Sequence, residues 1–597
     1  MKQRVWCSMD RIQGKGFLSN GVRCLRLLFQ VNPGMSYTYI GVALLQALSW
    51  VLQVLLLQRF LDAAAAYATG SIGFRMILLS LGALALMYLF YHVMDGLGNC
   101  YEEIYGLSVG KHLNLMIFKR VDSLQVSEFE DTKRLDYIHK AVNGSGKLIW
   151  IGTTLLDILF YYTTYFVFIG WYLFTLKPVL ALSIVVVFVP VMLSEWVLMS
   201  AFKNLEAASA PIRRESDYYE QCLTDKKHLS ETRLLGATAF FENLYTSALQ
   251  RLNAIVLRTQ VRKHLVQLIL NIVTVIGYGL IVYMLFVSVM KQEISIGAFA
   301  AVLASIGSLY RFMNKLITER IAWATENIGS TENFLDFIDE PVQRTSNMPK
   351  PADSDIELKA VRFRYPLATR NAVEEIDLII PNKQTLAIVG ENGSGKTTLC
   401  RIIMGLYPPT AGEVWYGKVE ASRTSYERTS AVFQHYRKYN ETIRENVRIS
   451  QYSKPADDTA VVSTCEEAGV LLSGEGVKEG LNTMLGREFG GTDLSGGQWQ
   501  RVAIARGLFR DSDYMILDEP TAAIDPLEET RLYNDFAALC RDKTAVLVSH
   551  RLGSVKLADR ILVMKDGRIV QDGTHEQLMS MEGEYRTMYE AQRKWYV

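Results

Sequence analysis

GENGSGKTT, residues 390–398, is the stretch that decides the fold of the second half of this chain. It follows the apolar run TLAIV (385–389), which is typical of a buried strand, and precedes LCRIIM (399–404), which is typical of a helix. A glycine-rich turn between a strand and a helix directs backbone N–H groups toward phosphate oxygens at the positive end of the helix dipole. Because the stretch has the spacing G-x-x-x-x-G-K-T, we expect it to bind a nucleoside triphosphate.

The residues of this loop have separable roles. Its glycines permit backbone torsions and close approaches that a Cβ would forbid. Lys396 supplies a positive charge for the β- and γ-phosphates, and the hydroxyl of Thr397 can ligate Mg²⁺. The candidate phosphate-binding residues are Gly390, Asn392, Gly393, Ser394, Gly395, Lys396, Thr397 and Thr398. The alternative is a glycine-rich turn that binds nothing.

Length and composition indicate a chain of more than one domain. At 597 residues it is too long for a single hydrophobic core. Hydrophobic residues make up 49% of the chain and are concentrated in its first half. The formal charge of +1 lacks the basic excess that nucleic-acid binding needs, so we expect no nucleic-acid partner. The seven cysteines show neither CxxC pairs nor metal-ligand spacing, which indicates reduced thiols.

The first half of the chain contains apolar segments that are long enough to cross a bilayer, which takes about 20 helical residues. They lie near 38–61, 74–95, 149–174, 178–200, 265–290 and 296–318. Any one of them could be a buried core helix. Together they predict an all-α, six-helix transmembrane domain.

Basic residues indicate how these spans are oriented. Lys and Arg are frequent in the N-terminal arm and in the two long connections, 96–148 and 201–263. Basic loops stay in the cytoplasm, so we expect both termini and both long connections there. The connections are polar and helically periodic, with breaks at tips near 127–131 and 224–228. We interpret them as levers that reach a cytoplasmic partner; the alternative is a pair of solvated hairpins without a coupling role.

A change of composition marks the domain boundary. Prolines and polar residues without an apolar period predict a linker near 340–354. Beyond it, strand-like runs alternate with helical ones, as in a soluble α/β domain. We therefore expect a multi-domain chain with a transmembrane domain at 1–340, a linker at 341–354 and an α/β P-loop ATPase domain at 355–597.

Several side chains after the loop suit hydrolysis of a triphosphate. YMILDE (514–519) is an apolar strand that ends in two carboxylates. Asp518 suits a role beside Mg²⁺, and Glu519 is placed to orient and deprotonate an attacking water. Gln434 follows another strand and can reach Mg²⁺ or that water, while His550 can hydrogen-bond a γ-phosphate oxygen, although a lone histidine at a strand end is usually structural. The candidate catalytic residues are Glu519, His550 and Gln434, and the candidate metal ligands are Thr397 and Gln434.

LSGGQ (494–498) opens a second predicted helix with free backbone donors. We count Ser495, Gly496, Gly497 and Gln498 as candidate nucleotide-binding residues, yet one chain does not need two such helix N-termini for one γ-phosphate. Tyr365 follows a strand and could stack on adenine, although a tyrosine in such a place more often packs in the core or lies on the surface.

In chain order these motifs resemble the ATP-binding cassette of an ABC transporter. The resemblance rests on GENGSGKTT, Gln434, LSGGQWQR (494–501), YMILDEP (514–520), AID (523–525) and His550. With six preceding spans, the chain resembles the half-transporters of the type IV exporter class, the bacterial relatives of multidrug and peptide exporters. FQHY (433–436) and TAAIDP (521–526) are among the turns that resemble lantibiotic and bacteriocin-peptide exporters in particular.

The resemblance implies an ATP hydrolase, with ATP and Mg²⁺ as cofactors, that drives export by alternating access. Two cassettes would pack head to tail, with each ATP between the phosphate loop of one and Ser495 and Gly497 of the other. Asp525 joins the nucleotide-binding set through the same resemblance, and the two tips would dock into the cassettes. The simplest assembly is a homodimer in the bacterial cell membrane, and a heterodimer stays open. The sequence departs from the family's usual acidic-basic-glycine run before LSGGQ, where Glu488 is followed by Phe489.

The cargo is expected to be a peptide or an amphipathic small molecule. Asp157, Glu195 and Arg311 are ionisable residues in or near predicted spans, where such groups are costly unless they face a cavity or one another. They are candidates for substrate contact or gating; the alternative is pairing between helices. Other functions that stay open are a lipid or oligosaccharide flippase, an exporter-shaped siderophore importer and an ATP-gated channel. A soluble ABC ATPase would not explain the six spans.

Overall fold

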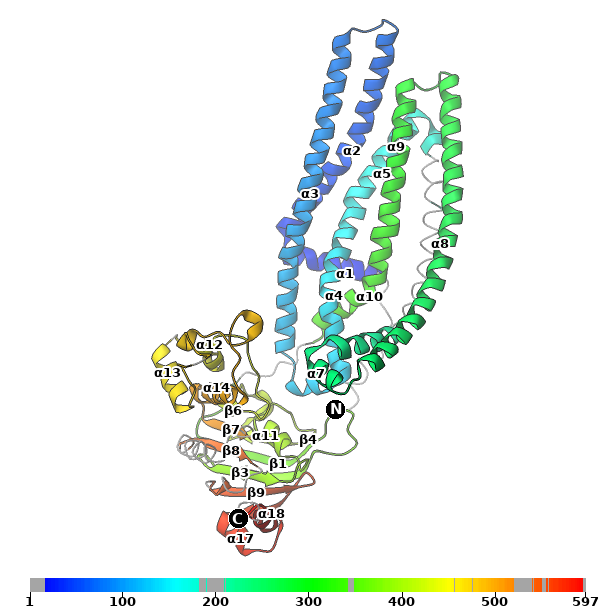
Figure 1. Ribbon diagram of the computed structural model, residues 1–597. Coiled ribbons are helices and arrows are strands. Elements are labelled where there is room, and N and C mark those ends of the chain that lie inside the picture. The colour runs from blue at the N-terminus through cyan, green and yellow to red at the C-terminus, as the bar shows by residue number, and fades with distance from the viewer. Residues whose placement is uncertain are drawn as a thin grey trace. The chain divides into compact units, whose positions relative to one another are not determined.

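The computed structural model describes residues 17–181, 189, 209, 211–341, 348–455, 457–474, 476–519, 540, 542–549, 555, 556 and 558–593. The chain divides into two compact units, each considered by itself (Figure 1). Unit 1 comprises Met1–Val121 and Tyr137–Glu340, and unit 2 comprises Asp122–Asp136 and Pro341–Val597. The short segment Asp122–Asp136 thus belongs to the same unit as the phosphate loop.

Unit 1 is helical. Its described helices are α1 (Phe17–Val31), α2 (Pro33–Ala68), α3 (Phe74–Asp122), α4 (Thr132–Leu156), α5 (Thr163–Leu176), α7 (Lys226–Leu234), α8 (Thr238–Met290), α9 (Ile296–Asn314) and α10 (Ala322–Asp339). The longest of them, α2, α3, α8 and the segments α4–α5 and α9–α10, run side by side (Figure 1). Two π-helical turns interrupt otherwise continuous helices. One, Asp157–Tyr162, joins α4 to α5, and the other, Lys315–Ile321, joins α9 to α10.

Within the described residues, five helical segments are long and apolar enough to cross a membrane. They are Pro33–Ala68, Phe74–Asp122, Thr132–Leu176, Thr238–Met290 and Ile296–Thr325. These segments contain the predicted spans at 38–61, 74–95, 149–174, 265–290 and 296–318, which are thereby confirmed as membrane-length helices. The predicted span at 178–200 lies almost entirely outside the described residues.

The long connections continue the membrane helices, as predicted. α3 runs without interruption to Asp122, and a short 3₁₀ helix, Val126–Glu130, forms the first tip before α4 begins. The second tip has its break at Asp225, within the predicted 224–228, but a further short helix follows the break. Asp225 interrupts the helix there, but its carboxylate also caps a new helix, α7, by accepting a 2.9 Å hydrogen bond from the Lys227 N–H. The tip is therefore a short helix.

Two close contacts hold α10 in unit 1. On α1, the Arg23 guanidinium pairs with Asp336 at 2.8 Å and with Asp339 at 2.7 Å. On α4, Gly144 lies so near α10 that a Cβ there would stand 2.1 Å from the Ser330 carbonyl oxygen. The absence of a side chain at Gly144 is thus what allows the two backbones to approach.

The nucleotide-domain part of unit 2 contains two sheets among its described residues. The first sheet has four strands in the order β2 (Val373–Ile380), β1 (Ile356–Phe363), β4 (Ala411–Tyr416) and β5 (Val419–Glu420). The second sheet has six strands in the order β10 (Arg568–Gly573), β9 (Arg560–Lys565), β3 (Thr385–Gly390), β8 (Thr544–Val548), β7 (Tyr514–Asp518) and β6 (Thr429–Val432). The second sheet is parallel except for its β9–β10 edge. Its helices are α11 (Lys396–Ile403), α12 (Ile443–Arg448), α13 (Asp458–Glu467), α14 (Gly496–Phe509), α17 (His575–Ser580) and α18 (Glu584–Arg593). Parallel strands end at one edge, so the residues after β3, β6, β7 and β8 gather there.

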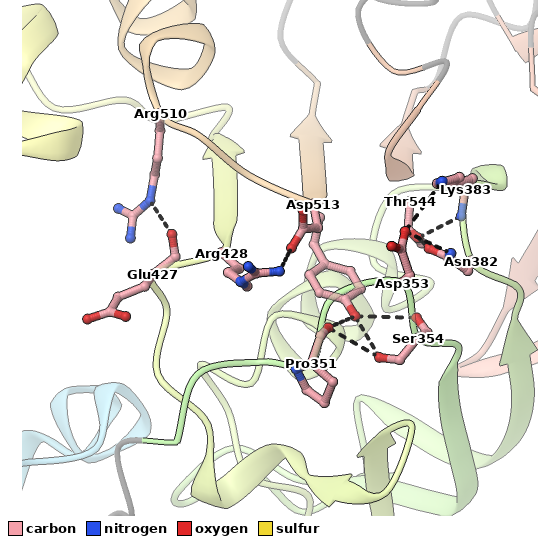
Figure 2. A network of polar contacts seen from close by, with 11 residues as sticks. Pro351, Asp353, Ser354, Asn382, Lys383, Glu427, Arg428, Arg510, Asp513 and Thr544 are labelled. Atoms are coloured by element: carbon pink, nitrogen blue, oxygen red, sulfur yellow. Dashed lines mark hydrogen bonds and ion pairs between the residues drawn. The ribbon is translucent and has the colours of Figure 1, made fainter. Parts of the chain in front are cut away.

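The end of the predicted linker packs into unit 2. The Lys350 ammonium is buried, donates to the Met404 carbonyl at 2.8 Å and to the Thr429 hydroxyl at 2.7 Å, and lies 4.4 Å from the centre of the Tyr416 ring. Burial lowers the pKa of Lys350 to about 7. The Tyr514 hydroxyl, at the start of β7, donates to the Pro351 carbonyl at 2.9 Å (Figure 2). The last part of the linker is therefore attached to the strand that carries Asp518.

We expect Gly144→Ala to destabilise unit 1, because the new methyl group would overlap a backbone oxygen that cannot move without shifting α10. Overpacking of this kind costs about 1–3 kcal/mol. Gly146→Ala is the matched control, since nothing lies within 4 Å of a Cβ at Gly146 and alanine favours a helix by about 1 kcal/mol. The thermal midpoint of the purified protein in detergent should fall for the first variant and hold or rise for the second. Equal midpoints would contradict the close approach.

Candidate functional site

The phosphate loop is held between backbone segments that leave no room for side chains. At Gly395, φ is +100° and a Cβ would lie 2.3 Å from the Ala372 carbonyl oxygen. At Gly390, at the end of β3, a Cβ would lie 2.2 Å from the Met564 carbonyl oxygen. Only glycine tolerates both conditions at Gly395. The loop is thereby fixed before α11, whose first residue is Lys396.

The Lys396 ammonium lies across the loop. It donates to the Gly390 carbonyl at 2.9 Å and to the Glu391 carbonyl at 2.8 Å, and the side chain is buried. Burial lowers the pKa of Lys396, while the nearby carboxylates Glu519 and Asp518 act in the opposite direction. A buried ammonium next to a ring of N–H groups is a binding site for an anion with several oxygens, such as a triphosphate.

Thr397 and Asp518 meet at the same edge of the sheet. The Thr397 hydroxyl donates to the Asp518 carboxylate at 3.2 Å, and burial raises the pKa of Asp518. In the loop beside them, the buried hydroxyl of Ser394 has no hydrogen-bond partner among the described residues. Hydroxyl and carboxylate oxygens are the ligands that Mg²⁺ prefers, so this set of oxygens fits a metal–nucleotide ligand.

Glu519, directly after β7, has a backbone conformation that is rare for a residue with a side chain. Its φ is +48°, and its N–H donates to the Val548 carbonyl at 3.1 Å. The Gln434 amide donates to the Glu519 carboxylate at 2.5 Å. The structure thus brings together two of the three predicted catalytic side chains. His550 and Asp525 lie outside the described residues.

Tyr365 lies beside the phosphate loop. Its hydroxyl is 3.0 Å from the Thr398 hydroxyl, and its ring packs edge-on against Phe363 and Tyr407. This position is compatible with the predicted stacking on adenine. Asn392 and Gly393 are exposed at the loop surface.

The LSGGQ segment makes its hydrogen bonds elsewhere in the described part of unit 2. The Ser495 hydroxyl caps α14 by accepting a hydrogen bond from the Gln498 backbone N–H. The Ser495 backbone N–H in turn donates to the side-chain oxygen of Gln498. The Tyr436 hydroxyl donates to the Gly496 carbonyl at 2.8 Å. Ser495 and Gly496 are exposed, and Gly497 is half-buried. The second helix N-terminus is therefore ordered, accessible and without a hydrogen bond to the phosphate loop in the residues described.

The first tip contacts the helix that follows the phosphate loop. The Glu130 carboxylate accepts hydrogen bonds from the Tyr407 hydroxyl and, at 3.4 Å, from Arg401 on α11. Tyr407 in turn stacks on Phe363, with ring centres 5.2 Å apart. Sequence reasoning predicted docking of this tip but missed Arg401 and Tyr407, because neither belongs to a motif. Residues 122–136 are thus tied to the element that carries Lys396.

Of the three ionisable residues predicted for the substrate path, the structure places two. Asp157, in unit 1, accepts a 2.9 Å hydrogen bond from the Tyr39 hydroxyl and lies 3.5 Å from the Arg320 guanidinium. Arg311 is exposed and donates to its own helix neighbour Ser308 at 3.3 Å. Glu195 lies outside the described residues. Arg320 was missed because it lies two residues beyond the last apolar window.

Fold and site together define an ATPase attached to a bundle of membrane-length helices. Comparison with known families makes the assignment specific. A family profile described as "ABC transporter" matches residues 373–522, and one described as "ABC transporter transmembrane region" matches residues 37–312. The chain belongs to the ABC transporters: it is a multi-pass membrane protein whose ATPase domain binds ATP and couples its hydrolysis to transport.

Curated relatives cover most of the chain. The nisin transport ATP-binding protein NisT of Lactococcus lactis subsp. lactis is 27% identical over 506 residues, 80% of this chain and 81% of the relative. The subtilin transport ATP-binding protein SpaT of Bacillus subtilis is 27% identical over 516 residues, 84% of this chain and 83% of the relative. An ATP-dependent lipid A-core flippase of Chromohalobacter salexigens is 32% identical over 303 residues, 50% of this chain and 51% of the relative.

A solved structure shows the same fold. A bacterial Atm1-family ABC exporter with ATP bound superposes with a TM-score of 0.71 at 20% sequence identity, covering 94% of this chain and all of that chain. The protein therefore has the exporter-type fold, a helical transmembrane domain followed by an ABC ATPase domain.

We expect Lys396→Ala to weaken ATP binding at least about tenfold, because a hydrogen bond from a charged group contributes about 1.5–3 kcal/mol. Lys418→Ala is the matched control, since Lys418 is exposed in the turn between β4 and β5. Equilibrium binding of a fluorescent ATP analogue measures the dissociation constants. Unchanged affinity in the Lys396 variant would remove this residue from the phosphate site.

Proposed function

We propose that the chain is one half of a homodimeric exporter in which each ATP lies between the phosphate loop of one chain and the LSGGQ helix of the other. One observation carries the proposal: Ser495 and Gly496 are exposed at an ordered helix N-terminus that makes no hydrogen bond to the phosphate loop among the residues described. Such a terminus is a ready anion site that only a second chain's nucleotide would use. The exporter-type fold supports the same assembly.

The side chains at the sheet edge divide the work of hydrolysis. Lys396 neutralises the phosphates, and Glu519 takes a proton from the attacking water while the Gln434 amide fixes its carboxylate at 2.5 Å. Thr397, Asp518 and Gln434 are the side chains that would hold Mg²⁺, which supplies charge neutralisation between the phosphate oxygens. His550 and Asp525 complete the proposed set, with Tyr365 against the adenine.

Glu130 is proposed to transmit the state of the nucleotide site toward the membrane helices. Its carboxylate bonds Arg401 and Tyr407, and Arg401 lies on the helix that begins with Lys396. A displacement of α11 on ATP binding would therefore displace the 3₁₀ helix Val126–Glu130 and the ends of α3 and α4 that flank it.

The proposed direction is export from the cytoplasm of a bacterium, with both termini and the ATPase domain on the cytoplasmic side. Basic connections support this orientation. The relatives named for nisin and subtilin transport favour a peptide or amphipathic cargo. The relatives named as lipid A-core flippases make lipid flipping the second candidate.

Complementation between two inactive variants tests the shared site. Lys396→Ala and Ser495→Arg should each abolish hydrolysis as homodimers. In a mixed dimer, both changes fall in the same composite site and the other site stays intact, so co-expression should restore ATPase activity. Placing both changes on one chain and co-expressing it with Lys396→Ala should restore nothing, because no intact site can form. Absence of restoration in the first mixture would refute the shared site.

The coupling contact predicts a change in amide hydrogen exchange. In the Glu519→Gln background, ATP should slow exchange across 126–130, because the closed site holds α11 in place. Adding Glu130→Gln should remove most of this protection, since the charged acceptor contributes about 1.5–3 kcal/mol. Asp136→Asn, an exposed carboxylate on α4, is the control that should leave the protection intact. Full protection from exchange in the Glu130 variant would show that this contact does not transmit the effect of ATP binding to residues 126–130.

A further inference from the structure

Unit 1 contains a polar cavity among its membrane-length helices. Its volume is about 80 Å³, enough for several water molecules. α2, α3, both π-helical turns and Phe312 of α9 contribute to its wall. Its ionisable residues are Tyr39, Asp95, Tyr101, Glu102, Asp157, Tyr161, Tyr162, Lys315 and Arg320. Space of this size suits a charged side-chain head group.

Two departures from α-helical geometry border the cavity. The π-helical turn at Asp157–Tyr162 supplies Asp157, Tyr161 and Tyr162, and the turn at Lys315–Ile321 supplies Lys315 and Arg320. π-helical turns are rare and are frequently found at functional sites. Both turns here carry an ionisable side chain into one cavity.

The cavity contains more carboxylates than enclosed cations. The half-buried Arg320 guanidinium lies 3.3 Å from Glu102 and 3.5 Å from Asp157, so two carboxylates share its single positive charge. Lys315 is exposed at the rim. Asp95 accepts only a 3.5 Å hydrogen bond from Tyr91 and has no cationic partner among the described residues. Three carboxylates, Asp95, Glu102 and Asp157, line the cavity together with two cations, Lys315 and Arg320. An enclosed carboxylate is costly without a cation, and the cavity is one positive charge short.

We propose that this cavity binds a cationic group of the cargo, a guanidinium or a primary ammonium, between Asp95, Glu102 and Asp157. The inference rests on the proposed export function. When cargo is absent, Arg320 pairs with Glu102 and Asp157. An incoming cation competes with Arg320 for these two carboxylates. The aromatic rings of Tyr161 and Phe312, which line the same space, offer further contacts for a cation.

The position of the cavity fits loading from the cytoplasm. Tyr39 and Asp95 lie at the ends of predicted spans that adjoin basic, cytoplasmic segments, and Arg320 follows the end of the last span. Cargo entering from that side would meet the carboxylates first. A lipid with an anionic head group would instead meet a surplus of negative charge.

Direct binding to the full-length protein in phosphatidylcholine nanodiscs, without nucleotide, tests the inference. The probe is a short dansyl-labelled peptide of alternating arginine and leucine, and its control has citrulline in place of arginine, which keeps the shape and removes the charge. Empty nanodiscs correct for partition into lipid. We expect saturable binding of the arginine peptide only. Equal binding of the citrulline peptide, or binding of neither, would overturn the proposal.

Substitutions identify the site. Asp95→Asn and Glu102→Gln should each weaken binding of the arginine peptide at least about tenfold. Glu103→Gln is the matched control, because Glu103 is exposed and does not line the cavity. Arg320→Gln should strengthen binding of the arginine peptide, since it frees two carboxylates; weaker binding would show that Arg320 does not compete with the bound cation and would overturn the proposal. If Arg320→Gln does not fold, the Asp95 and Glu102 variants decide.

The outcome is separable from that of the proposed function. Binding is measured without ATP, so its failure leaves the complementation of Lys396 and Ser495 variants unaffected. Conversely, a failed complementation would refute the shared ATP site. The peptide-binding experiment would still test whether the cavity binds a cation.

Discussion

The ATP site depends on the close approach of two neighbouring carbonyl oxygens to glycines of the phosphate loop. Met564 and Ala372 place carbonyl oxygens where the side chains of Gly390 and Gly395 would be. These two contacts fix where the loop leaves β3 and where it enters α11. Lys396, which directly follows Gly395, therefore has a defined position, and so does the hydrogen bond from Thr397 to Asp518. The chemistry of the site follows from this steric exclusion.

The sequence predicted those parts of the fold that local patterns determine. TLAIV, the glycine-rich turn and the strand before Asp518 have their own periodicity or spacing, and the structure has β3, α11 and β7 in those places. Membrane-length helices were equally predictable, because bilayer thickness sets their length. The contact of Gln434 with Glu519 could be anticipated, since both residues follow parallel strands of one sheet.

Contacts that depend on two distant segments could not be predicted. Arg401 and Tyr407 carry no motif, and only the fold brings Glu130 to them. Arg320 was overlooked because a charged residue falls outside an apolar hydropathy window. The π-helical turn nevertheless places its guanidinium near Asp157. The helix at the second tip was missed for a related reason: the same Asp225 that ends one helix starts the next. A sequence pattern can therefore show that a helix is interrupted without showing that another helix follows.

The attachment of Lys350 has a consequence for anyone who wishes to exchange domains between transporters. A junction placed at Ser354, where the first strand is about to begin, would remove a buried ammonium from the Tyr416 ring and from two acceptors on neighbouring segments. A foreign residue there would leave the Met404 carbonyl and the Thr429 hydroxyl without their donor. Chimeric proteins should therefore be spliced upstream of Met348, so that the cassette keeps its own anchor.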